Sequence, residues 1–246
     1  MPNPLLTEAV AVYLRGRRYV VVHITVALTM ALTAVAVWPH HSFLYFFRTG
    51  TQPLVLLATL IVQVVLVTGV SLAAGLDRIA GSAIIRHSEW LERTTLPIGV
   101  IVRGKLLAAV SHTAVLTLLG LPAAVVAAGP AGSGLAPVLA AQIVVFMSGS
   151  AARTAGMIIA HFGERSYVVR ITGGWVFLAL LFVATITVYP PLNPIAAVAS
   201  APGATVLNPV LASAGSLAGA TLLLMIVYRV SLARHRVKTE REVPNA

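Results

Sequence analysis

The stretch LVLLATLIVQVVLVTGVSLAAGL, residues 54–76, contains no charged residue and is apolar almost throughout. A helix needs about 20 such residues to cross the roughly 30 Å hydrocarbon core of a bilayer. Because lipid offers the backbone no hydrogen bonds, a spanning segment of this kind must satisfy its own as a helix. The stretch therefore predicts a transmembrane helix in a chain whose main solvent is lipid.

Five further runs of the same kind lie on either side of this stretch. They cover residues 19–38, 106–128, about 136–160, about 171–189 and about 209–228. The composition agrees, because 58% of the residues are hydrophobic and only 10% are charged, whereas soluble domains are about 25% charged. We therefore expect an all-α membrane protein with six transmembrane helices, forming one transmembrane domain over residues 19–230.

The basic residues predict how these helices are oriented. All but two of the seventeen Lys and Arg precede the first run, lie between runs two and three or four and five, or follow the sixth. Cytoplasmic loops carry such an excess of positive charge, so we expect both termini in the cytoplasm. The net charge of +10 is then a topology signal, and nucleic acid is not an expected partner. Nearly all the basic residues are arginine, which hints at a bacterial genome rich in GC and at a multi-pass protein of the bacterial plasma (inner) membrane.

Three segments outside the runs have a character of their own. Residues 1–18 mix apolar and basic positions, which suits an amphipathic helix at the cytoplasmic interface, with a frayed tail as the alternative. Residues 190–208 are apolar, yet four prolines and a glycine prevent one continuous helix there, so short helical pieces in the outer leaflet are expected. Residues 231–246 are expected to form a cytoplasmic tail.

The longest cytoplasmic loop, residues 77–105, predicts a short amphipathic helix. Ser88 can act as its N-cap, and Glu89 and Glu92 suit the positive end of the helix dipole. Pro97 disfavours helical geometry in the residue before it, so the helix is expected to end near Leu96. Such a helix needs a surface to pack against, either the membrane or another protein.

The sequence RHSEWLERTTLPIGVIVRGKLL, residues 86–107, resembles the loop between spans two and three of permeases of the type-2 ABC exporter family. That family has a short Thr/Leu/Glu-rich helix there, then a Pro-containing turn and a Gly-Lys-Leu-Leu start to the third span. It also has six spans, cytoplasmic termini, an amphipathic N-terminal helix and a broken Asn-Pro-containing segment before the last span, which LNPIAAVA at 192–199 resembles. This chain departs from the family at His87 and Ser88, where a Gly is frequent.

The resemblance implies a function and its partners. The short helix would be a coupling helix that sits in a groove on a cytoplasmic ABC ATPase dimer, and the contact residues would be Arg86, Ser88, Glu89, Trp90, Leu91, Glu92 and Arg93. The ATPase would hold ATP and Mg, so this chain would bind no cofactor and would not itself be an enzyme. With a second permease subunit, identical or related, it would export a hydrophobic or amphipathic substrate (a drug, lipid or peptide) by alternating access.

The same loop contains G-x-x-x-x-G-K, from Gly99 to Lys105, which matches most of a nucleotide-binding P-loop. The Ser or Thr that should follow the lysine and hold magnesium is replaced by Leu106. A P-loop also needs a buried strand before it and a soluble α/β domain around it, whereas here a membrane span follows. We therefore do not expect this chain to bind ATP.

Polar residues inside the predicted spans are candidates for a substrate path, because they are costly in lipid. The candidates are Thr25, Thr29, Thr33, Gln63 and His112. The alternative is structural: the threonines would bond to their own helix, and Gln63 and His112 would hold helices together. Small residues at 148, 152, 156 and 160 predict a close helix contact. Arg153, in the same run, is expected to snorkel or to pair with Glu164 or Asp77.

No residue set points to catalysis or to a metal. The chain has no cysteine, its histidines are scattered, and no Asp or Glu lies within a span. Ion-coupled carriers usually place an acid there, which favours an external energy source. Two alternatives stay open: a scaffold or assembly subunit of a membrane complex that does not transport, and an ion-coupled carrier that uses His112.

Overall fold

The computed structural model describes residues 11–13, 15–38, 54–76, 97–162, 166–201 and 207–242, and these residues form helices and no strand. The long helices are α2 (Arg17–Ala36), α4 (Leu54–Gly75), α6 (Ile98–Ala128), α7 (Leu135–Phe162) and α11 (Leu207–Glu242). A fifth crossing is composite and runs through α8 (Tyr167–Ala179), the π-helix η1 (Leu180–Ala184) and α9 (Thr185–Val188). Six helical stretches are long and apolar enough to cross a membrane, which confirms the predicted multi-pass helical fold; the orientation of the termini stays a prediction.

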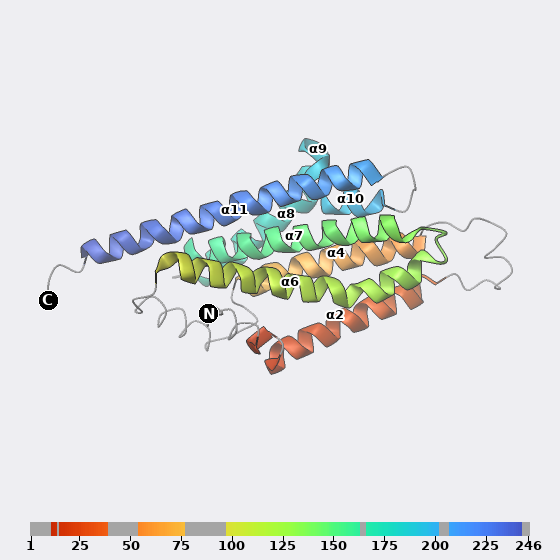
Figure 1. The fold of residues 1–246 in the computed structure, drawn as a ribbon, viewed down its shortest axis with the longest axis horizontal. Helices are drawn as coiled ribbons and strands as arrows, with labels where there is room; N and C mark the ends of the chain where they lie inside the picture. Colours follow the sequence, from red (N-terminus) through yellow and green to blue (C-terminus); the bar gives the residue numbers. More distant parts are fainter. Residues whose placement is uncertain are drawn as a thin grey trace.

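Helices α4 and α7 form the centre of the bundle. The contact between α4 and α7 is the most extensive in the fold. Helix α11 packs on α7, α6 packs on both α4 and α7, and α2 packs on α4 and α6 (Figure 1). In the most apolar stretch of α7, 61% of the residues are buried inside the protein. In the crossing formed by α8, η1 and α9 the corresponding share is 11%. The interior therefore lies along α4 and α7, and α2 and α8 lie at the periphery.

Glycines bring α4 and α7 together at their C-terminal halves. A Cβ added to Gly156 would lie 2.7 Å from the carbonyl oxygen of Leu72 and 2.9 Å from Cα of Gly75. A Cβ added to Gly75 would overlap the carbonyl oxygen of Arg153. The two backbones touch here with no room for a side chain, as in other membrane helix pairs built on small residues. The close contact predicted for the small residues of α7 is confirmed at Gly156.

The break before the last long helix consists of two short helices held in place by hydrogen bonds of one asparagine. The short helices η2 (Pro190–Leu192) and α10 (Pro194–Ala199) follow α9, as the prolines predicted. Asn193 is fully buried between them, and its Oδ1 accepts from the Ala196 N–H at 2.8 Å, which caps α10. Its Nδ2 donates to the Phe182 carbonyl and to Thr185 Oγ1, both at 2.9 Å. One side chain therefore caps the N-terminus of α10 and also donates a hydrogen bond to a backbone carbonyl of the π-helix.

Replacing Asn193 with Ala is expected to lower the free energy of unfolding by about 2–4 kcal/mol, because it removes the cap of α10 and takes the donor from the part-buried Phe182 carbonyl and Thr185 hydroxyl. The midpoint of SDS-induced unfolding in mixed micelles, followed by circular dichroism, measures the change. Asn208→Ala is the matched control, since Asn208 is exposed in the first turn of α11, and its change should stay within about 0.5 kcal/mol. Equal effects of the two substitutions would show that Asn193 is not a structural anchor.

Two helices extend past their predicted boundaries. Helix α6 begins at Ile98 directly after Pro97, so the final residues of the predicted loop 77–105 are helical. Proline suits a helix start because the first N–H groups have no partner within the helix. Val100 and Ile101 both donate to the Pro97 carbonyl, so the Gly99–Lys105 stretch forms helical turns. Residues 77–96, and with them the predicted coupling helix, lie outside the described residues.

Helix α11 continues to Glu242, so the predicted tail 231–246 is helical over most of its length. No Gly or Pro occurs between Gly219 and Pro244, and Ala, Arg, Lys and Glu in this part are strong helix formers. At 1.5 Å per residue, its 36 residues measure about 54 Å, which is far longer than a bilayer core. Hydropathy marks where a span ends and not where its helix ends, so the predicted cytoplasmic tail came without a secondary structure, and its location stays a prediction.

The outer surface of the bundle is apolar along its spans. Helix α2 exposes large apolar side chains from Val21 onward at spacings of three and four residues, namely Val21, Ile24, Leu28, Leu32 and Val35, and it also exposes Val20. The α8–α9 crossing exposes others, among them Trp175, Val176, Leu180, Val183 and Ile186. Such continuous apolar faces would aggregate in water and are stable in lipid or against another membrane helix.

Candidate functional site

The first polar layer of the interior joins α4, α6 and α7 through two glutamines. Gln63 on α4 and Gln142 on α7 exchange reciprocal amide hydrogen bonds of 2.8 and 2.9 Å, and both are buried. Gln63 Nε2 also donates to the Thr117 carbonyl on α6 at 3.0 Å. Gly120 faces the Gln63 side chain, and a Cβ added there would overlap its amide. This layer is closed, because both amides find partners inside the protein.

A second layer of hydroxyl groups lies further along the same helices. Thr68 and Ser148 share a hydrogen bond of 3.2 Å between α4 and α7, and Ser71 and Thr113 share one of 3.4 Å between α4 and α6. Ser148 and Thr113 also donate to backbone carbonyls of their own helices. Gly149 on α7 leaves space for the side chains of α4 and α6 at this layer, since an added Cβ would overlap the Thr113 methyl group. These hydroxyls hold the three helices in register.

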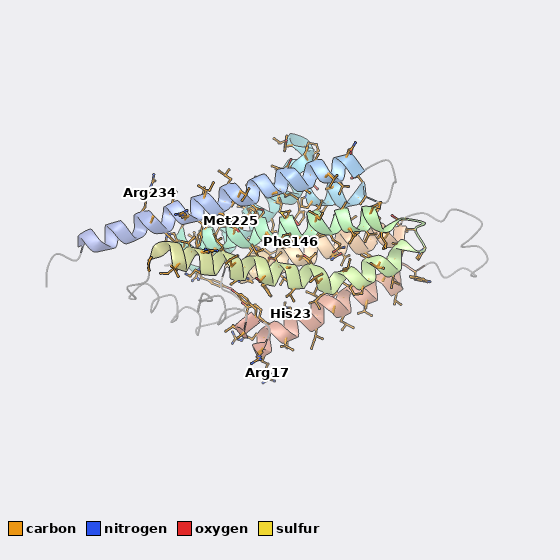
Figure 2. The ribbon with its side chains drawn as sticks, viewed as in Figure 1. Arg17, His23, Phe146, Met225 and Arg234 are labelled. Atoms are coloured by element: carbon orange, nitrogen blue, oxygen red, sulfur yellow. The ribbon has the colours of Figure 1, made fainter. Side chains whose placement is uncertain are left out.

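The third layer is a cluster of five side chains, Tyr13, Tyr19, His23, His112 and Arg153, which we call the aromatic–arginine cluster. The ring of Tyr13 stacks on that of His112, with centroids 4.8 Å apart, and Tyr19 meets both rings edge-on. His23 Nε2 on α2 lies 3.2 Å from His112 Nε2 on α6. Figure 2 shows His23 on the side of α2 that faces α6. The cluster therefore joins the N-terminal segment, α2, α6 and α7.

Arg153 gives this cluster a buried positive charge. Its side chain is 3% exposed on α7, and Nη2 donates to Tyr13 Oη at 2.6 Å. The guanidinium carbon lies 5.1 Å from the centre of the Tyr13 ring, within the range of a cation–π contact. Arg153 was expected to snorkel or to pair with Glu164 or Asp77, and the structure adds Tyr13 as a partner that was not expected. Asp77 and Glu164 lie outside the described residues, so this expectation stays a prediction.

The structure does not bring the predicted substrate-path side chains together in one place. Gln63 and His112 are buried in separate layers, each with a neighbour on another helix. Thr25 is exposed, and Thr25 and Thr33 donate to carbonyls of their own helix, as the structural alternative describes. Thr29 is half-buried on the same helix. The path as a whole stays a prediction, and so do the coupling residues from Arg86 to Arg93, which are not among the described residues.

Several residues that build the interior were not predicted from the sequence. They are Tyr13, Tyr19, Thr68, Ser71, Thr117, Gly120 and Gly149; Asn193 was noted only as part of the Asn-Pro segment, without its role as an anchor. A signal for some of them was present: paired polar positions on α4 and α7 keep a nearly constant separation of 79 residues for Gln63 and Gln142 and 80 for Thr68 and Ser148. That regularity is what two helices running in the same direction produce when they pack side by side.

Within the described part of the chain, no three His, Cys, Asp or Glu side chains gather as a metal site would require. Comparisons with protein families, with curated proteins and with solved structures found no match to this chain. The site must therefore be interpreted from its own residues. What they define is a multi-pass helical membrane protein with a buried polar interior that ends in a cationic, aromatic cluster.

Proposed function

We propose that this chain is the membrane subunit of an ATP-driven exporter of the ABC type. The observation that carries the proposal is the break at Asn193 and Pro194 between the fifth crossing and the last long helix. This break supports the resemblance at residues 192–199. Asn193 is fully buried and has three hydrogen-bond partners, so the segment is a defined part of the fold and not an irregular loop. The resemblance at residues 86–107, which ends in the first turns of α6, supplies the link to an ATPase.

In this proposal the ATPase dimer binds ATP and Mg, and this chain converts its motion into movement of helices. The α4–α7 pair would move as one unit, because its glycine contact and shared polar layers resist sliding. The peripheral helices α2 and α8 carry the exposed apolar faces. A second subunit would pack on such a face, and the substrate would pass between the two subunits. The apolar character of these faces favours a hydrophobic or amphipathic substrate.

The test is co-purification of an ATPase with the tagged chain from its native membrane in mild detergent. A soluble protein with a complete P-loop is the expected partner, identified by mass spectrometry. The double variant Glu89→Ala/Trp90→Ala should reduce its recovery by about tenfold, the loss expected when about 1.4 kcal/mol of contact is removed. Leu222→Ala is the control, because it shortens an exposed apolar side chain on α11, outside the α2 and α8 faces, and should leave the recovery unchanged.

The proposal fails if no such ATPase is recovered after chemical cross-linking in several detergents. It also fails if the double variant retains as much ATPase binding as Leu222→Ala, since the contact predicted for Glu89 and Trp90 would then be absent. Recovery of a different membrane complex would favour the scaffold alternative.

One observation favours an ion-coupled carrier as the second candidate, namely the His23–His112 contact between α2 and α6. Two imidazoles within hydrogen-bond distance can pass a proton between them. A carrier would keep its transport when Glu89 and Trp90 are replaced and lose it with His112→Ala. An exporter would lose transport with the Glu89→Ala/Trp90→Ala variant.

A further inference from the structure

The Arg153 guanidinium is buried with unused hydrogen-bond donors. Nη2 donates to Tyr13 Oη, but Nε and Nη1 are both buried and meet no acceptor among the described residues. Arginine stays protonated in proteins, so the group carries its charge into the interior. A buried charge with unmade hydrogen bonds costs several kcal/mol, which the Tyr13 ring offsets only in part.

No carboxylate within the spans can neutralise this charge. The sequence places every Asp and Glu outside the six predicted runs. The other described members of the cluster are aromatic or imidazole rings, and none of them is an anion at neutral pH. The cluster is therefore positive and lacks a partner of opposite charge within the described residues.

The neighbours of Arg153 supply further donors. Tyr13 Oη accepts from Arg153, which leaves the Tyr13 hydroxyl hydrogen available to donate. His112 stacks on Tyr13, and its Nδ1 is buried with no hydrogen-bond partner among the described residues. When His23 Nε2 donates to His112 Nε2, the proton of His112 is on Nδ1, so this atom is also a donor. The unused groups of the cluster thus favour a ligand that offers only acceptors.

We propose that the aromatic–arginine cluster binds a phosphate group, with Arg153 as the charged contact and Tyr13 as the second donor. A phosphate carries more acceptor oxygens than a carboxylate, so it can accept from the guanidinium with one or two oxygens and from a neighbouring donor such as the Tyr13 hydroxyl with another. Arg153 lies nine residues from the end of α7 at Phe162, or about 14 Å along the helix. Basic pockets between membrane helices near one end of a bundle bind lipid headgroups. The phosphate can therefore belong to an anionic phospholipid or be free in solution, and the proposal does not depend on an ATPase partner.

The experiment uses the full-length chain purified in a neutral detergent. Its melting temperature and its lipid adducts in native mass spectrometry are measured with added phosphatidylglycerol, diacylglycerol, inorganic phosphate or chloride. The wild type should bind phosphatidylglycerol, inorganic phosphate or both, with a rise in melting temperature that diacylglycerol and chloride, which carry no phosphate, do not give. Arg153→Gln should weaken this binding by roughly tenfold or more, since it removes a charged hydrogen-bond donor.

Two further variants keep the test decisive. Arg103→Gln removes one positive charge from an exposed position on α6 and should leave the binding unchanged. Tyr13→Phe keeps the stacked ring but loses the hydroxyl, so it should fold normally and bind a few-fold more weakly. A response to phosphatidylglycerol alone assigns the site to lipid, and a response to inorganic phosphate assigns it to a soluble anion.

Three results would overturn the proposal. The first is a wild type that responds to neither phosphate source. The second is an Arg153→Gln or Tyr13→Phe variant that folds and binds like the wild type. The third is an Asp77→Asn or Glu164→Gln variant that, without added phosphate, is destabilised as strongly as Arg153→Gln, because the counter-charge would then belong to the chain itself.

Discussion

Gly156→Val is expected to lower the free energy of unfolding by about 3 kcal/mol, at the upper end of the range for overpacked interiors. The reason is that the new Cβ would press on the backbone of α4 at Leu72 and Gly75, which cannot turn away as a side chain can. The helices must separate, and the polar layers between them would then lose their hydrogen-bond geometry. SDS titration in mixed micelles, followed by far-ultraviolet circular dichroism, measures the loss.

The chain offers a matched control for this experiment on α4 itself. A Cβ added to Gly69 would meet no atom within 4 Å. Gly69→Val therefore changes the same residue type in the same kind of helix without touching α7, and its effect should stay within about 1 kcal/mol. If Gly69→Val and Gly156→Val are equally damaging, the cost comes from β-branching in a helix and the close contact of α4 with α7 is refuted.

The Gln63–Gln142 pair should show a large coupling energy in a double-mutant cycle. Gln63→Met alone leaves the buried Gln142 amide without its partner, and Gln142→Met leaves the Gln63 carbonyl oxygen unpaired while Nε2 keeps the Thr117 carbonyl, each at a cost of about 1–3 kcal/mol. The double variant replaces both amides by apolar side chains of similar size, so it should be more stable than either single variant and close to the wild type. The midpoint of SDS-induced unfolding of the four proteins gives the coupling energy.

Thr25→Val provides the control for this cycle, because Thr25 is exposed and bonds only within α2. Combined with Gln142→Met, it should be additive within about 0.5 kcal/mol. Additivity in the Gln63–Gln142 cycle as well would mean that the two amides do not depend on each other, which the two hydrogen bonds between them do not allow.

The sequence predicted the elements of this fold well, because their signals are local. Apolar length predicted six crossings, and the prolines around Asn193 predicted the break before α11. The partners of each helix were not predicted, since hydropathy does not say that α4 packs most extensively on α7 when α6 lies between them in sequence. The sequence carries that pairing only in the nearly constant separation between paired polar or glycine positions on α4 and α7, which is 81 residues for Gly75 and Gly156.

The candidate site was harder to predict for the same physical reason. Arg153 and Tyr13 are 140 residues apart, and a tyrosine in a segment read as interfacial gives no sign that it enters the bundle. The three threonines of α2 are regularly spaced, but regular spacing does not show which face of a helix turns inward. His112 and Gln63 were predicted as interior candidates, because a strongly polar side chain in lipid needs a partner.

The pairing of Gln63 with Gln142 has a consequence for how the protein is made. Gln63 is synthesised 79 residues before its partner, and at 5–20 residues per second the ribosome needs about 4–16 s to supply it. During that interval α4 has left the ribosome with its amide, its hydroxyls and Gly75 lacking the surface of α7. The maturing chain therefore passes through a stage in which α4 must be shielded by the insertion machinery or by transient neighbours, and the stage ends when α7 arrives.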